Sequence, residues 1–126
     1  NGGPNGDIYV EFTVKSHPLF IRQDKDIYVK LPITITDAVL GCKKEVPTLD
    51  GAVKLTIPPG SSTGDKHRLR GKGISNVNGF GKGDMYVILD VKIPEKLSRE
   101  QKKLFTMLAE TDLEDSKDFK EFRKYL

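Results

Sequence analysis

Few side chains in this chain are of types suited to catalysis or ligand binding. It has one cysteine, Cys42, and two histidines, His17 and His67, and no serine or cysteine is placed with them to make a recognisable catalytic triad. The segment Arg70-Gly71-Lys72-Gly73 matches neither common phosphate-binding glycine pattern, because a further loop and a strand are expected after it rather than a helix. No carboxylate cluster has metal-ligand spacing, and a lone cysteine excludes both an internal disulfide and a cysteine-based zinc cluster. We therefore interpret both histidines as ordinary loop and strand residues, and we expect no catalytic residue, no metal and no cofactor.

Two apolar surfaces are stronger candidates for function, and the first is an edge between two short strands. Val29 and Leu31 share a face of one alternating segment, while Lys44 and Val46 share a face of another. An extended peptide can add to such an edge as a further strand, with backbone hydrogen bonds giving affinity and side-chain pockets giving specificity. Alternation of this kind is equally typical of a sandwich core, and the sequence leaves that alternative open. The candidate peptide-binding residues are Val29, Leu31, Lys44 and Val46.

The second candidate surface is an apolar stripe in the C-terminal tail. Ser98 with Gln101 three residues later forms the pattern of a capping box, which predicts that a helix begins there. A second, short helix carries aromatic side chains at spacings of three and four, and such a helix must pack against something to be stable. It can fold back on its own domain, but its place at the chain end favours a symmetric dimer contact. The candidate dimer residues are Leu104, Leu108, Phe119, Phe122, Tyr125 and Leu126.

The elements that must position these residues are mostly strands. A long strand is expected over residues 27–35, and because Pro32 has no amide donor, this strand should lie at a sheet edge or lack its partner there. Thr36 is expected to cap a short helix over residues 37–40 that Gly41 ends. Before this strand, Leu19 and Phe20 are interpreted as an apolar plug at a domain junction.

Further strands complete the expected fold. The Asp50-Gly51 pair, preceded by Leu49, predicts a hairpin between segments 43–48 and 52–57, with positive φ at both central residues. A short basic strand is expected over residues 66–70 and a final strand over residues 84–93. The resulting fold class is mostly β: a small two-sheet β-sandwich with one short helix, followed by C-terminal helices.

An internal repeat indicates how the chain is divided. The pattern from Gly6 to Pro18 returns 77 residues later as the pattern from Gly83 to Pro94, and both copies alternate like a half-buried strand. A repeat of this length is a domain rather than a solenoid unit. The chain is therefore expected to be a fragment. Its parts are residues 1–15, a linker and last strand of a truncated β-domain, residues 16–94, a complete β-sandwich domain, and residues 95–126, a helical dimerisation tail.

Composition narrows the class of partner. The chain has 126 residues, of which 31% are charged, and a net charge of +3. So small and mixed an excess does not predict the dense basic face of a nucleic-acid-binding protein. No apolar run approaches the roughly 18 residues of a membrane span. A reducing, cytoplasmic compartment is the expected one, because the chain has a single cysteine.

At this point the residues resemble the C-terminal region of bacterial-type DnaJ co-chaperones, over roughly residues 6–110. The motif pair Val-Pro-Thr-Leu-Asp-Gly and Arg-Leu-Arg-Gly-Lys-Gly is highly specific for that family. The final segment, residues 116–122, is similar to its Phe-rich tail. The segments that carry the resemblance are 17–22, 33–41, 46–51, 57–60, 68–73 and 83–87.

The resemblance implies a fold and a function. It implies two similar β-rich domains in tandem, of which residues 16–94 are the second, and a tail that joins two protomers. It implies that unfolded client polypeptide is held for a DnaK-type ATP-driven chaperone, without enzymatic activity. By the repeat, the family's client groove falls on Val29, Leu31, Lys44 and Val46, the edge identified above. A purely structural spacer and dimerisation module, with client binding confined to the first domain, is the alternative.

The chain also departs from the family pattern. Lys25 stands where the family usually has glycine, so the turn at residues 23–26 must differ or carry modest strain. His17 and Pro18 are followed by Leu19, not by the aspartate of the J-domain motif, and the family's Cys-x-x-Cys zinc repeats do not occur in this sequence. This chain is therefore not expected to stimulate a partner's ATPase by itself.

Overall fold

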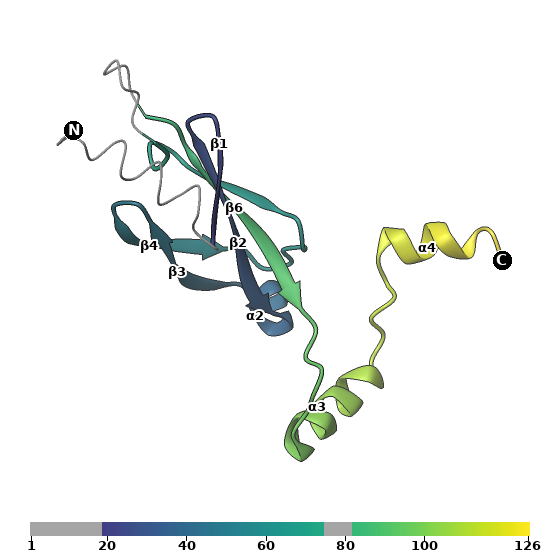
Figure 1. The fold of residues 1–126 in the computed structure, drawn as a ribbon. Coiled ribbons are helices and arrows are strands. Elements are labelled where there is room, and N and C mark those ends of the chain that lie inside the picture. The colour runs from purple at the N-terminus through teal and green to yellow at the C-terminus, as the bar shows by residue number, and fades with distance from the viewer. Residues whose placement is uncertain (1–18, 75–81) are drawn as a thin grey trace. The chain divides into compact units, whose positions relative to one another are not determined.

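The computed structural model describes residues 19–74 and 82–126 (Figure 1). The chain divides into two compact units at the bond between Ile93 and Pro94, and each unit is described by itself. The first unit is mostly β and the second is helical, as the fold class expected. The strand expected near the N-terminus, with the first copy of the repeat, lies outside the described residues. So does much of the glycine-rich loop that follows Gly73.

A four-stranded sheet forms the larger layer of the first unit. Two parallel strands, β2 and β6, lie at its centre, and each has an antiparallel neighbour on its outer side. Residues alternate between a buried and a more exposed face along β2 and β6, as the sequence predicted. The strand order is β1 (Phe20–Gln23), β2 (Asp26–Thr34), β6 (Met85–Lys92) and β5 (Lys66–Leu69).

Two features of this sheet differ from the sequence interpretation. Phe20 is not a plug between domains; it is the buried first residue of β1, a strand that the sequence did not predict. Pro32 lies in a central strand, so the edge alternative was wrong. The alternative, that β2 lacks a partner at Pro32, is confirmed on one side of the strand. On that side β2 has β1 as its neighbour, and β1 pairs only with Asp26 to Val29.

A hairpin forms the second layer. Its strands are β3 (Cys42–Thr48) and β4 (Gly51–Ile57), and Thr48 lies opposite Gly51. The expected turn is therefore confirmed, but its centre is Leu49-Asp50, and only Gly51 has a positive φ, 113°. The Thr48 hydroxyl organises the turn: it donates to the Gly51 carbonyl oxygen at 2.5 Å and accepts from the Asp50 amide at 3.1 Å.

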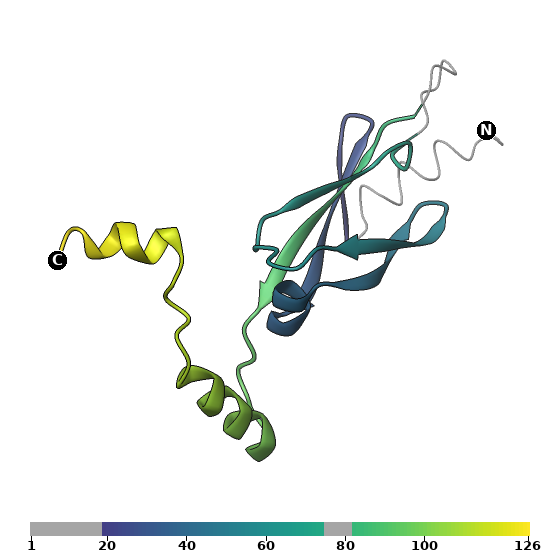
Figure 2. The same cartoon turned by 180° about the vertical axis from the view of Figure 1, so that it is seen from behind.

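The short helix α2 (Ile35–Leu40) connects the two layers and lies at the end of β2 in both views (Figures 1 and 2). Its N-cap is Thr34, not Thr36, because the Thr34 hydroxyl accepts from the Asp37 amide and the Asp37 carboxylate accepts from the Thr34 amide. Gly41 ends the helix as expected. At φ 81° it lies so close to the hairpin that a Cβ there would be 2.9 Å from the Ile57 carbonyl oxygen.

One apolar core lies between the two layers. Each sheet contributes the inward-facing residues of its strands, and α2 contributes Ala38. The expected arrangement of two β-sheets around a core is thus confirmed. The largest fully buried side chains are Ile27, Val46, Ile57, Met85, Val87 and Leu89.

The β1–β2 turn shows how the chain accommodates Lys25. Among the described non-glycine residues only Asp24 has a positive φ, 61°, and aspartate tolerates this conformation better than most residues. Lys25 itself has no positive φ, so the left-handed position of this turn is Asp24. The Lys25 carbonyl oxygen accepts a hydrogen bond from the Ile74 amide at 2.8 Å, so this turn is held against the loop that follows β5.

The second unit contains two helices, α3 (Arg99–Ala109) and α4 (Lys117–Arg123). The capping box of Ser98 and Gln101 is confirmed, with both reciprocal hydrogen bonds present. Helix α4 is shorter than the aromatic stripe, so Tyr125 and Leu126 lie beyond its last residue. In the part of the chain that the structure describes, no helix is long and apolar enough to cross a membrane.

Candidate peptide-binding edge and exposed tail

Three of the four candidate peptide-binding residues meet at the core. Val29 and Val46 are only 3% and 0% exposed and belong to the core cluster, and Leu31 packs against that cluster while staying partly accessible. Side chains as buried as Val29 and Val46 cannot contact a peptide directly. Leu31 lies on the same face of β2 as Val29 and is half-buried.

The fourth residue, Lys44, is held by α2. It lies on the same face of β3 as Val46, and its Nζ is 3.1 Å from the Asp37 carboxylate. The hydrogen bond from Lys44, followed by those from Thr34, lowers the pKa of Asp37 below its ordinary value. The Lys44 side chain as a whole is 39% exposed, so part of it stays accessible. Desolvation, with nearby Asp37 acting in the same direction, raises the pKa of the Cys42 thiol, so this cysteine is not an activated thiolate.

The backbone of β3 has an unused edge. Among the described residues, β3 pairs with β4 alone, on one side, and its other side has no strand partner. An edge of this kind is a template for a further strand. Pro47 lacks an amide donor, so a peptide would find donors only on the part of the strand before it.

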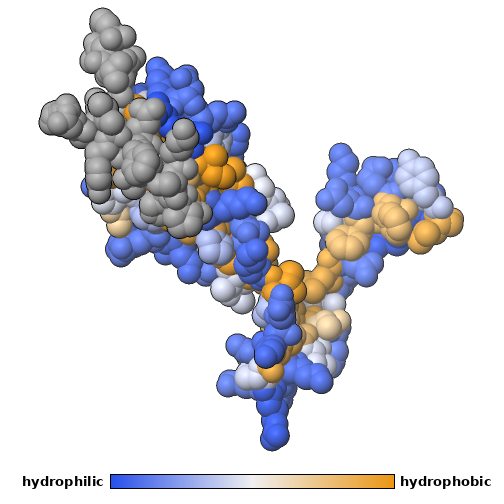
Figure 3. Space-filling model, in the orientation of Figure 1, coloured by the Kyte–Doolittle hydropathy of each residue, from blue (hydrophilic) through white to orange (hydrophobic). Residues whose placement is uncertain are grey.

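The helical tail exposes most of its apolar side chains. Figure 3 shows hydrophobic residues open to solvent in both helices of this unit, among many hydrophilic ones. Phe122 is 68% exposed, and apolar groups of this size are rarely left in water without a partner. All six candidate dimer residues are exposed in the single chain: Leu104, Leu108, Phe119, Phe122, Tyr125 and Leu126.

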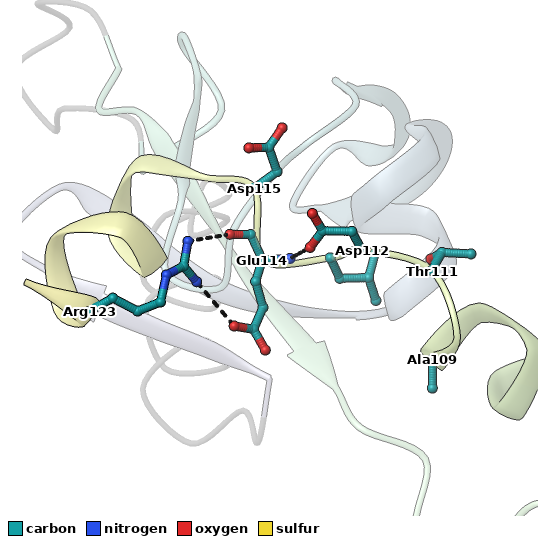
Figure 4. A pocket seen from close by; sticks show the side chains of 7 residues that line it. Ala109, Thr111, Asp112, Glu114, Asp115 and Arg123 are labelled. Carbon is teal, nitrogen blue, oxygen red and sulfur yellow. Dashed lines mark hydrogen bonds and ion pairs between the residues drawn. The ribbon is translucent and has the colours of Figure 1, made fainter. Parts of the chain in front are cut away.

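The segment between α3 and α4 forms a polar hollow against Arg123 (Figure 4). The Arg123 guanidinium donates to the Glu114 carboxylate at 3.2 Å and to the Glu114 carbonyl oxygen at 3.5 Å. The Glu114 amide in turn donates to the Asp112 carboxylate at 2.9 Å. The contacts of Arg123 tie the last residue of α4 to the segment that precedes this helix.

The described residues give no sign of a metal centre. Within ranges 19–74 and 82–126, no three histidine, cysteine, aspartate or glutamate side chains are grouped so that they could hold an ion. His67 is a half-buried residue of β5, and His17 lies outside these ranges.

One surface was missed by the sequence interpretation. Tyr28 and Tyr86 are direct neighbours on β2 and β6, on the face turned away from the core, and their rings stack. The available signal was a short repeat: Asp26-Ile27-Tyr28-Val29 and Asp84-Met85-Tyr86-Val87 have the same Asp-apolar-Tyr-Val pattern. Two strands with the same pattern are expected to present the same side chains on the same face when they pair.

Comparisons with known proteins agree with these features. Residues 1–94 match the family model described as DnaJ C terminal domain. The chain is 51% identical over 115 residues to a Ruminiclostridium cellulolyticum protein named Chaperone protein DnaJ. The aligned region covers 91% of this chain and 30% of that protein. It is 46% identical over 126 residues to the protein of that name from Bacillus velezensis, covering 98% of this chain and 34% of that protein. The chain thus spans about a third of the length of the curated relatives it matches.

Proposed function

Because the chain belongs to the DnaJ C-terminal domain family, we propose that it is a non-enzymatic part of a co-chaperone that binds unfolded client polypeptide. In this role it forms a homodimer through its tail and passes clients to a DnaK-type chaperone. The observation that carries the proposal for this domain is that, among the described residues, one edge of β3 has no strand partner; Leu31 of β2, which packs against the same core, stays partly accessible. The free thiol of Cys42 supports a reducing compartment, and we propose the cytoplasm.

The proposed mode of binding is strand addition along β3. The peptide backbone pairs with the part of β3 that precedes Pro47, and an apolar client side chain rests on Leu31. Lys44 lies in the part of β3 that precedes Pro47, and it offers its ammonium group to peptide carbonyl oxygens. Val29 and Val46 act indirectly, as the packed floor that holds both strands in place.

A site of this size binds weakly on its own. A short peptide covers far less area than a stable protein interface, so a dissociation constant on the order of micromolar or weaker is expected. A dimer carries two such sites, and a client that spans both gains affinity through effective concentration. Weak, paired sites suit a chaperone that must release its client.

The proposal is tested by fluorescence-anisotropy titration of an extended apolar peptide with the 126-residue chain. Leu31→Asp places a charge at the accessible apolar contact and is expected to weaken binding by about tenfold or more. Ile21→Asp makes the same change at an exposed position on the opposite face of the sheet and is expected to leave the affinity unchanged. Circular dichroism of both variants checks that they are folded.

A second peptide tests the strand addition directly. Methylation of alternate backbone amides removes hydrogen-bond donors while keeping the side chains, and it is expected to abolish binding. Equal binding of the methylated peptide would contradict strand addition. If the unmodified peptide does not bind up to high micromolar concentration, this domain is a spacer and a dimer clamp, the alternative function.

The dimer is tested separately through the tail. Phe122→Asp introduces a charge into the apolar stripe of α4, and it is expected to raise the dimer dissociation constant by about 10- to 100-fold, the usual effect of removing a central aromatic contact. Lys117→Asp changes the charge of the same helix at its first turn and is expected to leave the dimer intact. Sedimentation equilibrium over a range of concentrations measures both. A wild-type chain that stays monomeric at high micromolar concentration would contradict the dimer.

A further inference from the structure

The outer face of the four-stranded sheet carries an aromatic pair beneath a cation. The rings of Tyr28 and Tyr86 stack with their centroids 5.1 Å apart and their planes at 21°. The Lys66 Nζ lies over both rings, 5.6 Å from the Tyr28 centroid and 5.4 Å from that of Tyr86. Three strands, β2, β6 and β5, therefore supply one contiguous cluster, in which the π systems hold the ammonium group.

Apolar side chains extend this cluster on both sides. Ile21 of β1 lies opposite Tyr28 in the register and is 64% exposed. Ile88 of β6 lies between Lys30 of β2 and Lys66 of β5 on the same face. We call this surface the tyrosine face, made of Ile21, Tyr28, Lys30, Lys66, Tyr86 and Ile88.

The positive charges near the two tyrosines differ in whether they have an acidic partner. Arg68 is paired with Asp84 at 2.6 Å, and Lys92 is paired with Asp90 at 2.9 Å. In the part of the chain that the structure describes, neither Lys30 nor Lys66 has a carboxylate within ion-pair distance. Two cations without acidic partners thus flank an exposed apolar and aromatic strip.

We propose that the tyrosine face binds an acidic, extended peptide segment of a partner protein. Lys30 and Lys66 both flank Ile88, so they are two strand spacings apart, about 10 Å. In an extended chain, side chains two residues apart lie on the same face about 7 Å apart, so two such carboxylates reach both flexible lysine side chains. An apolar side chain two residues further along, on the same face, lies on Tyr28 and Ile21. Burial against apolar surface strengthens both ion pairs, because water is excluded from around them.

The same observations argue against a nucleic acid at this site. One face of each tyrosine ring is covered by the other ring, and Lys66 lies over both, so the pair offers little ring surface on which a base can stack. Arg68 and Lys92 are already paired with Asp84 and Asp90, so this face lacks the run of free cations that a chain of phosphates requires. A ligand with only a few negative charges fits better than a polyanion.

The probe for this proposal is a short labelled peptide of sequence Leu-Thr-Glu-Thr-Glu, which places the leucine and both glutamates on one face of an extended chain, titrated against the 126-residue chain by fluorescence anisotropy. A matched peptide has lysine in place of every glutamate. The glutamate peptide is expected to bind and to lose affinity as salt is raised, while the lysine peptide does not bind. Lys66→Glu and Lys30→Glu are each expected to weaken binding about tenfold or more. Lys54→Glu, an exposed lysine of β4 in the other sheet, is the control and leaves the affinity unchanged.

The outcomes separate this site from the edge of β3. Ile21→Asp weakens binding of the glutamate peptide and not of the apolar peptide, and Leu31→Asp does the reverse. Equal binding of both charged peptides, or unchanged binding by the Lys66→Glu variant, overturns the proposal. It is also overturned if a single-stranded oligothymidylate binds at this face in place of the glutamate peptide.

Discussion

Replacing Gly83 by alanine is expected to destabilise the β-domain by about 3 kcal/mol or more, near the upper range for overpacking. A Cβ on Gly83 would lie only 1.9 Å from the Lys25 carbonyl oxygen and 2.5 Å from the carbonyl carbon. Both atoms belong to the backbone, so no rotation of a side chain relieves the clash. Either the β1–β2 turn or the start of β6 must move.

The surroundings of Gly83 leave little room for that movement. Its amide donates to the Ile74 carbonyl oxygen at 3.0 Å, and its carbonyl oxygen accepts from the Gly73 amide at 2.9 Å. The Ile74 amide donates in turn to Lys25. These hydrogen bonds join three segments that are distant in sequence, and a shift at Gly83 breaks more than one of them. Each buried donor or acceptor that loses its partner adds to the cost.

Gly64→Ala is the matched control. Gly64 has a positive φ, 91°, which Gly83 does not, but an added Cβ at Gly64 would meet no atom within 4 Å. Its cost is therefore limited to the left-handed conformation, about 1–2 kcal/mol. Urea denaturation followed by circular dichroism gives both values. A loss for Gly83→Ala no larger than that for Gly64→Ala would show that the neighbouring backbone moves to accept the Cβ at little cost, and would contradict the prediction.

Local patterns in the sequence predicted most strands of the fold but not their neighbours. Alternation located β2 and β6, and the Ser98 capping box located the start of α3, because each signal is contained within a few consecutive residues. The four-residue strand β1 is too short to show a period of two. The cap at Thr34 was misassigned to Thr36 because both threonines lie near the start of the helix, and only the three-dimensional position of Asp37 decides between them.

The burial of the candidate peptide-binding residues could not be predicted from local sequence patterns either. The sequence placed Val29, Leu31 and Val46 on apolar faces, but the burial of each depends on how two sheets pack. The tyrosine face depends on a parallel pairing in which Asp26 and Asp84, 58 residues apart, lie side by side. Register over such a separation is determined by the whole core, so the repeated Asp-apolar-Tyr-Val pattern acquires its meaning only in the folded sheet.

Val46→Asp is expected to unfold the β-domain and not merely to weaken peptide binding. Val46 is 0% exposed and belongs to the apolar core cluster, where a carboxylate would be removed from water. An unpaired charge in an apolar core costs several kcal/mol, which is comparable with the whole stability of a small domain, about 5–15 kcal/mol. The aspartate is accommodated only if β3 leaves the core.

Two further variants separate the charge from the packing. Val46→Ala removes two methyl groups and is expected to cost about 2 kcal/mol, with the fold retained. Lys43→Asp places the same carboxylate on the exposed face of β3 and is expected to stay within about 0.5 kcal/mol of the parent chain. Circular dichroism and urea denaturation measure all three. A folded Val46→Asp variant with near-normal stability would mean that this side chain reaches solvent, and a direct role for Val46 in peptide binding would then be restored.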